Sequence, residues 1–232
     1  MASRVVIKIG GSLFFDDVGF NAHRVQEFAH FVMKTPEIQA IIVGGGKFAR
    51  TYIQGARALG ASEAECDLLG IATSRMNGQL LIRAIGDTAY PRVPESVEEF
   101  AKARATSKIV VMGGLQPGQS TTSVAVIIAE FLHADLLAVL TNVDGIYDKD
   151  PRKFSDAKRF STITVDQLLK VLQKGAGGKQ VAAGEYQIFD PVSSEIVKRS
   201  QLPVQLLSGK ELAQVTRVIK DATADVGTKI TH

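Results

Sequence analysis

Cysteine and tryptophan are almost absent from this sequence: its 232 residues include one cysteine, Cys66, and no tryptophan. A single cysteine excludes an internal disulfide framework, and with it the small disulfide-stabilised domains of secreted proteins. No apolar run approaches the roughly 20 residues that a membrane-spanning helix requires, and no basic and apolar signal region opens the chain. We therefore expect a cytoplasmic protein without a membrane partner.

A strong charge of either sign is also missing. Lys and Arg together number 27 and Asp and Glu 24, for a net charge of +3, and the basic residues are scattered along the chain. A nucleic-acid-binding surface gathers its basic residues in runs or on one face. We therefore expect no nucleic-acid partner, and the charge alone names no other one.

Glycine, by contrast, is frequent, with 21 residues, and 45% of the chain is apolar. Short β-branched runs alternate with segments of helical periodicity along the chain, which is typical of an α/β protein with a mostly parallel sheet. At 232 residues the chain fits one large domain. The expected strands are residues 4–9, 40–43, 90–93, 108–112, 136–140, 204–207 and 227–231.

Three of these strands run directly into glycines, at Gly10, Gly44 and Gly113. Such turns let backbone N–H groups approach an anion, and a helix that follows adds its positive end. Lys8 lies at the end of the first strand, where burial is costly unless an anion meets it. Each feature has a plain structural alternative: a tight turn for the glycines, and an edge-strand lysine that reaches solvent for Lys8. Neither the P-loop pattern nor the dinucleotide Gly-x-Gly-x-x-Gly pattern is present.

Residues 62–84 have the periodicity of a long helix. We expect its apolar positions to pack into the core and, from the pattern alone, its interleaved polar positions to face water. The apolar positions are Leu68, Leu69, Ile71, Ala72, Met76 and Leu80, and the polar ones are Asp67, Thr73, Arg75 and Asn77.

Residues 113–122 combine glycines and glutamine amides with three hydroxyls, Ser120, Thr121 and Thr122, before an apolar helix. This composition suits an anion or a polar small molecule, although an ordinary capped helix shares it. Residues 139–151 carry a buried-strand pattern into a polar turn at Asp144 and Gly145, which can equally be a plain turn. The glycine-rich residues 175–180 suit either a lid or a surface loop without a role.

The carboxyl ends of parallel strands share one edge of a sheet, where open α/β folds bind their ligands. The edge expected here carries glycine backbones, Lys8, Arg50 and the three hydroxyls. Such a set suits several phosphates at once. The sequence therefore predicts phosphoryl transfer without a Walker motif.

Four segments, in order, carry a family resemblance: residues 8–12 (Lys-Ile-Gly-Gly-Ser), 44–50 (Gly-Gly-Gly-Lys-Phe-Ala-Arg), 113–121 and 141–151. They resemble the signatures of the amino-acid kinase superfamily, and within it the chain is most similar to the archaeal uridylate (UMP) kinases. The likeness covers essentially the whole chain, including Asp67 and the helix start after Phe189.

The resemblance implies a three-layer αβα sandwich with a mostly parallel sheet. Residues 1–232 would form one domain, with an acceptor-binding lobe at about 1–112 and an ATP-binding lobe at about 113–232. It also implies ATP as co-substrate with Mg²⁺, and transfer of the γ-phosphoryl group to UMP to give UDP and ADP in pyrimidine biosynthesis. For the assembly, it implies a homohexamer. The chain length leaves no room for the regulatory domain of aspartokinases.

For the site, the resemblance implies that Lys8 and Arg50 are catalytic, with Lys8 bridging the transferring phosphoryl group and Arg50 holding the UMP phosphate. No residue is expected to ligate Mg²⁺, which ATP oxygens and water would hold. The ATP-binding residues would be Lys8, Gly10, Gly11, Ser12, Gly45, Arg50, Thr141, Asn142, Tyr147 and Asp150. The UMP-binding residues would be Gly44, Arg50, Asp67, Leu115, Gln116, Pro117, Gly118, Gln119, Ser120 and Thr121.

One position departs from the family pattern. Many relatives carry an aspartate where this chain has Thr122, and we expect Asp144 to substitute for the missing acid. Because this acid is missing, an alternative function for the chain is nucleotide binding without turnover, as a regulatory or storage protein on the same fold. A further alternative is a kinase for a carboxylate, a carbamate or isopentenyl phosphate, against which Arg50, Asp67 and residues 116–121 favour a nucleotide acceptor.

Overall fold

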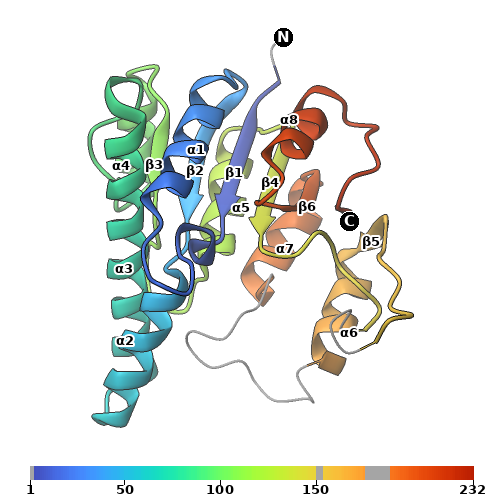
Figure 1. The fold of residues 1–232 in the computed structure, drawn as a ribbon, viewed down its shortest axis with the longest axis horizontal. Coiled ribbons are helices and arrows are strands. Elements are labelled where there is room, and N and C mark those ends of the chain that lie inside the picture. Colours follow the sequence, from blue (N-terminus) through green and yellow to red (C-terminus); the bar gives the residue numbers. More distant parts are fainter. Residues whose placement is uncertain (1–2, 150–153, 176–188) are drawn as a thin grey trace.

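The structure, a computed structural model, describes residues 3–149, 154–175 and 189–232. One seven-stranded sheet, in the order β3-β2-β1-β4-β6-β7-β5, runs through this part of the chain (Figure 1). Neighbouring strands are parallel except for β6 and β7, as the sequence predicted. The strands are β1 (Val5–Ile9), β2 (Ile38–Val43), β3 (Val110–Met112), β4 (Leu136–Thr141), β5 (Thr162–Thr164), β6 (Val204–Ser208) and β7 (Thr228–Thr231).

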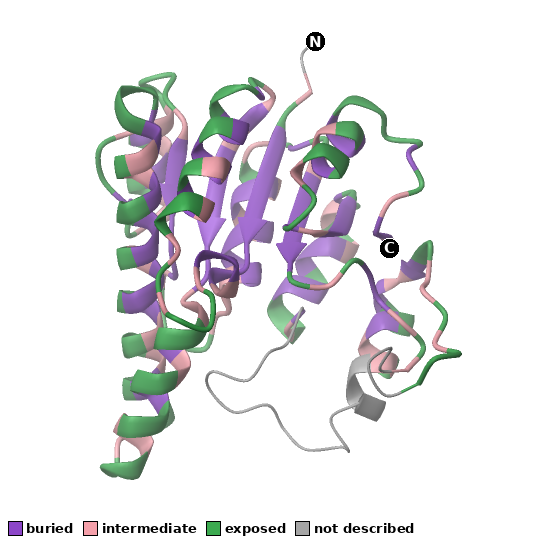
Figure 2. Cartoon of the chain, viewed as in Figure 1, coloured by how far each residue is buried: buried purple, intermediate pink, exposed green. Residues whose placement is uncertain are grey.

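The central strands are buried on both faces, which is why they read as unbroken apolar runs in the sequence. All five residues of β1 are buried, and in each of its neighbours β2 and β4 all but one residue are buried (Figure 2). Residues 90–93, by contrast, do not form the short strand expected there; Ala89 makes only an isolated bridge to Ile109.

Helices cover both faces of the sheet and complete three layers. One hydrophobic core joins one face to α4 (Val97–Arg104), α5 (Thr121–Phe131), α6 (Val165–Gly175) and α7 (Pro191–Ser200). A second core joins the other face to α1 (Ala22–Met33), α3 (Glu63–Ile85) and α8 (Leu212–Lys220). α2 (Gly46–Ala58) packs on α3, and two short 3₁₀ turns are η1 (Gly11–Phe14) and η2 (Gly86–Thr88). The expected three-layer αβα sandwich is confirmed.

Local signals in the sequence set the starts of several helices. The Asn21 side chain accepts a hydrogen bond from the Arg24 backbone N–H at 2.9 Å and caps α1. Ser62 begins α3 with a reciprocal capping box. Pro191 occupies the first turn of α7, where its missing N–H costs nothing.

Most of α3 packs the opposite way to what its pattern predicted, although Ile71, at 8% exposed, is buried as expected. Leu68, Met76 and Leu80 are 54%, 51% and 43% exposed, whereas Thr73 and Asn77 are each 3% exposed. The prediction failed because apolar residues occur at helical spacing on both sides of this helix. Leu81 and Ile85 supply the face that packs on the sheet.

Strands β1, β2 and β3 form one half of the sheet, and the strands after residue 112 form the other, joined where β1 pairs with β4. The division into an acceptor lobe and an ATP lobe stays a prediction. Among the described residues, no helix combines the length and apolar character needed to span a membrane.

Candidate active site

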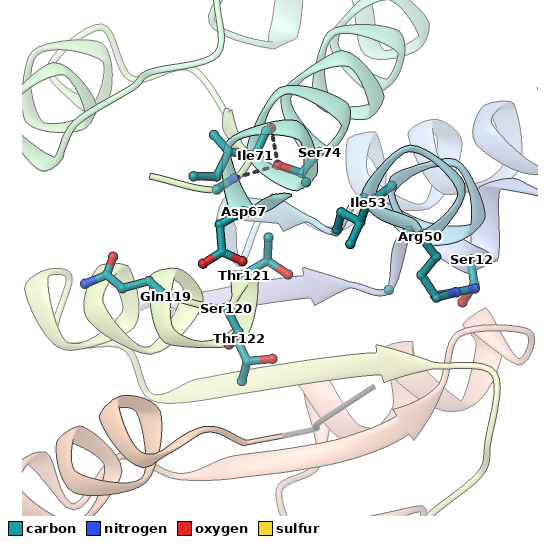
Figure 3. A pocket seen from close by; sticks show the side chains of 18 of the residues that line it. Ser12, Arg50, Ile53, Asp67, Ile71, Ser74, Gln119, Ser120, Thr121 and Thr122 are labelled. Carbon is teal, nitrogen blue, oxygen red and sulfur yellow. Dashed lines mark hydrogen bonds between the residues drawn. The ribbon is translucent and has the colours of Figure 1, made fainter. Parts of the chain in front are cut away.

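A cavity of about 190 Å³ opens where β1 and β2 end, between the first turns of α2 and α5 and the side of α3 (Figure 3). It brings together eleven of the predicted site residues: Lys8, Gly10, Gly11, Ser12, Gly44, Gly45, Arg50, Asp67, Gln119, Ser120 and Thr121. The structure adds Gly46, Ala49, Ile53, Gly70, Ile71, Ser74, Gly114 and Thr122 to the lining. The volume is below the roughly 300–1,000 Å³ of a pocket for a whole small molecule, so this cavity suits phosphates rather than two complete nucleotides.

The first two glycine turns interlock at the floor of the cavity. A Cβ atom on Gly11 would lie 2.1 Å from the Gly44 carbonyl oxygen and 2.5 Å from the Gly46 nitrogen. Gly46 also has a φ of 68°, in the left-handed region that side chains disfavour. These positions therefore admit glycine alone, and the turns hold each other in place.

Arg50 of α2 lies beside Ser12, while Asp67 of α3 points toward Thr121 (Figure 3). The Asp67 carboxylate accepts a hydrogen bond from the Gly118 backbone N–H at 2.8 Å. This bond joins two of the predicted UMP-binding elements. Gly118 itself and the loop residues before it, Leu115, Gln116 and Pro117, are not part of the cavity lining.

The start of α5 is held by α7. Ser120 caps α5, and its backbone N–H donates to the Asp190 carboxylate at 3.2 Å, while the Ser123 hydroxyl donates to the same carboxylate at 2.6 Å. Burial opposes ionisation of Asp190, yet hydrogen bonds from Ser120, Ser123 and Ser193 outweigh it and hold the pKa of this carboxyl below its ordinary value. The sequence predicted Asp190 only as a helix cap.

Lys8 is the principal charge of the cavity. It lies in the middle of the sheet, paired in register with Ile42 of β2 and Val139 of β4, and is 7% exposed. This position excludes the edge-strand alternative. Within the described residues it makes no ion pair or hydrogen bond, and burial lowers the pKa of its ammonium group to about 8. The site thus holds a desolvated cation without a protein counter-ion.

The predicted ATP-binding residues beyond β4 lie outside this cavity. Thr141 is buried and uses its hydroxyl within its own turn, accepting from the Val143 N–H at 3.0 Å. Asn142 is exposed and Tyr147 is half-buried. Asp150 and most of residues 175–180 are outside the described residues, apart from Gly175, which ends α6.

Asp144 does not take the place of an acid at Thr122. Both of its carboxylate oxygens accept from the Tyr147 hydroxyl, at 3.1 Å, whereas Thr122 lines the cavity and Asp144 does not. Burial, and then the hydrogen bond to Asp144, raise the pKa of the Tyr147 hydroxyl. The expected substitution is therefore wrong for this structure.

The described residues contain no cluster of three or more His, Cys, Asp or Glu side chains that could hold a metal ion. Within the described residues, the cavity lining contains one carboxylate, that of Asp67, and it already bonds to Gly118.

Three polar residues of α3 hold the loops of the site, and the sequence pattern had placed two of them, Arg75 and Asn77, in water. The Ser74 hydroxyl accepts from the Gly114 N–H at 2.7 Å, and the Arg75 guanidinium donates to the Gly114 carbonyl at 3.0 Å. The Asn77 amide donates to the carbonyls of Gly44 and Gly45 at 2.8 and 3.1 Å. The sequence feature that could have indicated this role is the placement of these polar residues between apolar ones along the helix.

The sequence matches the model of the amino acid kinase family over residues 3–208. The chain therefore belongs to the amino acid kinase family, as its motifs predicted. Uridylate kinase of Methanobrevibacter smithii is 40% identical over 229 residues, which cover 98% of each chain. Uridylate kinase of Methanocaldococcus jannaschii is 41% identical over 225 residues, or 95% of this chain and 98% of that one.

Solved structures agree with this assignment. The crystal structure of uridylate kinase from Archaeoglobus fulgidus matches with a TM-score of 0.82 and 33% identity, covering 98% of this chain and 100% of the other. UMP kinase from Bacillus anthracis matches with a TM-score of 0.78 at 21% identity, which supports the fold alone. The amino-acid kinase fold is thereby confirmed.

The buried charge of Lys8 predicts a pH-dependent stability difference. Below pH 8 the ammonium is charged in both the folded and unfolded chains, so Lys8→Met should raise the free energy of unfolding of the ligand-free protein by about 3 kcal/mol at pH 7. Between about pH 8 and 10.5 the folded chain loses this proton before the unfolded chain does. The native protein therefore gains stability with rising pH, and the difference should close.

Urea unfolding from pH 7 to 10.5 measures this difference. Lys108→Met, at an exposed lysine just before β3, is the matched control and should show no such closing gap. A Lys8→Met advantage that stays constant across this range contradicts a lowered pKa.

Proposed function

We propose that the chain transfers the γ-phosphoryl group of ATP to UMP, giving UDP and ADP, in pyrimidine nucleotide biosynthesis. One observation carries the proposal: Lys8 lies buried, without a counter-ion among the described residues, in a cavity lined by two interlocked glycine turns and the start of α5. Uridylate kinases that are 40–41% identical over nearly the whole chain support UMP as the acceptor.

The reaction asks the protein for alignment and charge compensation. An oxygen of the UMP phosphate forms a bond to the γ-phosphorus while the bond from that phosphorus to the bridging oxygen breaks, and ADP leaves with the electron pair. The attacking oxygen is already anionic, so no general base is required. Lys8 and Arg50 counter the repulsion between the two phosphate groups. Mg²⁺, held by ATP oxygens and water, supplies further charge compensation when bound.

The two nucleotides approach from different sides of Lys8. Gly10, Gly11, Ser12 and Gly45 would face the ATP phosphates, and Thr141, Asn142 and Tyr147 would hold the ATP nucleoside. Gly44 and Arg50 would hold the UMP phosphate, with Asp67 and residues 115–121 around its ribose and base. The bond from Gly118 to Asp67 supports a single acceptor wall.

A panel of acceptors tests this proposal. With Mg-ATP, the purified protein should phosphorylate UMP in preference to CMP, AMP, carbamate and carboxylates, because Asp67 and residues 115–121 suit a uridine nucleotide. Coupled detection of ADP measures turnover, and Lys8→Met, run in parallel, excludes a contaminating kinase. Nucleotide binding without turnover of any acceptor would support the regulatory or storage alternative and contradict the proposal.

We also infer that the chain forms a homo-oligomer through the exposed apolar face of α3. Leu68, Ala72, Met76 and Leu80 recur every four residues on that face, and all are exposed. An i, i+4 ridge of this kind packs into the groove of a second helix. An apolar ridge about 18 Å long, at 1.5 Å per residue, is unusual on a surface that stays solvated.

A second copy fits this face because its four apolar positions, 68, 72, 76 and 80, are symmetric about residue 74. Two α3 helices packed antiparallel across a two-fold axis would place each residue opposite its mirror position. Leu68 then faces Leu80, the small Ala72 faces the long Met76, and the acidic Glu65 faces the basic Arg83. A two-fold contact gives a dimer, so the predicted hexamer needs a further interface, and both the hexamer and the cytoplasmic location stay predictions.

Substitution within this face tests the oligomer. Leu80→Glu places a charge in the apolar contact and should lower the assembly mass by half or more in sedimentation experiments. Leu59→Glu, at an apolar residue that is 90% exposed at the end of α2, is the matched control and should keep the native mass. A Leu80→Glu protein of native mass would rule out this interface.

A further inference from the structure

Asn77 is buried in the middle of α3 and directs its side chain away from its own helix. It is 3% exposed, and its amide nitrogen donates to the Gly44 carbonyl at 2.8 Å and the Gly45 carbonyl at 3.1 Å. A buried polar side chain in a helix usually satisfies itself within that helix. Thr73, one turn earlier, does so: its hydroxyl donates to the Leu69 carbonyl at 2.7 Å.

The two carbonyls that Asn77 holds belong to consecutive peptide groups at the floor of the cavity. A peptide group is planar and trans, so fixing its carbonyl oxygen also fixes the N–H on the opposite side. Asn77 therefore sets the directions of the Gly45 and Gly46 N–H groups. Neither N–H donates to another described residue, and both glycines line the cavity.

These two peptide groups lie at the boundary between the two nucleotides of the proposed reaction. The N–H groups that Asn77 orients belong to Gly45, assigned to the ATP phosphates, and to Gly46, and they directly follow Gly44, which is assigned to the UMP phosphate. In-line transfer depends on the separation and angle between these phosphates. We propose that Asn77 is a positioning residue that sets the alignment of the donor and acceptor phosphates through the backbone of Gly44 and Gly45.

The neighbouring residues of α3 make this placement rigid. Ser74 and Arg75 hold the two peptide groups of Gly114, in the loop after the neighbouring strand β3, at 2.7 and 3.0 Å. Arg75 is itself paired with Glu95 at 2.5 Å. Residues 74–77 of one helix thus bond to both the loop after β2 and the loop after β3. The helix therefore fixes the distance between these two loops.

The variant Asn77→Ser tests the positioning role of Asn77 separately from its contribution to folding. A serine hydroxyl can bond to the carbonyl four residues earlier in the helix, as Thr73 does, but it is too short to reach Gly44 and Gly45. We expect kcat to fall about 10- to 100-fold, as for a misplacement near 1 Å. The dissociation constants of UMP and of ATP, each measured alone, should change less than about threefold, because each phosphate still meets Lys8 and Arg50.

Thr73→Ala is the matched control, since it removes a polar group of equal burial from the same helix. It should lower the unfolding temperature about as much as Asn77→Ser does and leave kcat within about twofold, as expected when no cavity loop is contacted. Equal losses of kcat in the two variants, or an unchanged kcat in Asn77→Ser, would overturn the inference. If Asn77→Ser does not fold, Asn77→Ala replaces it in the same measurements.

This inference rests on the proposed function, so a second readout is needed that does not depend on turnover. In ¹H–¹⁵N spectra of the ligand-free protein labelled on glycine, the amide signals of Gly45 and Gly46 should shift in Asn77→Ser and stay near their native positions in Thr73→Ala. Absence of UMP turnover in the native protein would contradict the proposed function alone. Unshifted Gly45 and Gly46 amide signals in Asn77→Ser would contradict the role of Asn77 alone.

Discussion

The buried cation of Lys8 is the constraint on which the rest of the site depends. Taking an ammonium group out of water is unfavourable unless an anion compensates it, and the described residues provide no such anion for Lys8. Its place in the central strand, between β2 and β4, leaves the side chain 7% exposed and facing the cavity. The folded protein therefore carries an electrostatic cost that a bound phosphate would relieve.

The backbone around Lys8 also favours the binding of a phosphate. Gly11 and Gly46 approach too closely for any side chain between them, and the first turns of α2 and α5 both open on the cavity. The partial positive charge of a helix start attracts phosphate. The absence of a protein acid at Thr122 adds to this bias, because it leaves the positive charge uncompensated until substrate binds.

α3 links this site to the surface of the molecule. Its buried polar residues hold the loops after β2 and β3, whereas its exposed apolar residues form the face proposed for a second copy. A change in the packing of α3 would therefore reach the cavity directly. This arrangement gives a physical route by which assembly and alignment of the phosphates can depend on each other.

The sequence predicted the parts of this protein that are encoded locally. Six of the seven strands, the helix start after Phe189 and the glycine turns each depend on residues close together in the chain, and the motifs identified the family. The role of Asn77 was missed because its partners are 33 and 32 residues away, and the bond from Ser123 to Asp190 spans 67. Two apolar faces on α3 left the choice of the packed face to tertiary contacts that the helical pattern does not contain.

The most direct test is the pKa of Lys8 itself, measured by NMR titration of labelled lysine side chains, with Lys8→Met to assign the signal. In the free protein we predict a pKa of about 8. With UMP and a non-hydrolysable ATP analogue bound, the pKa should rise well above its value in the free protein, because the phosphates favour the charged form. A value near 10.5 in the free protein, or one that does not move when both nucleotides bind, would contradict a buried lysine that awaits a phosphate.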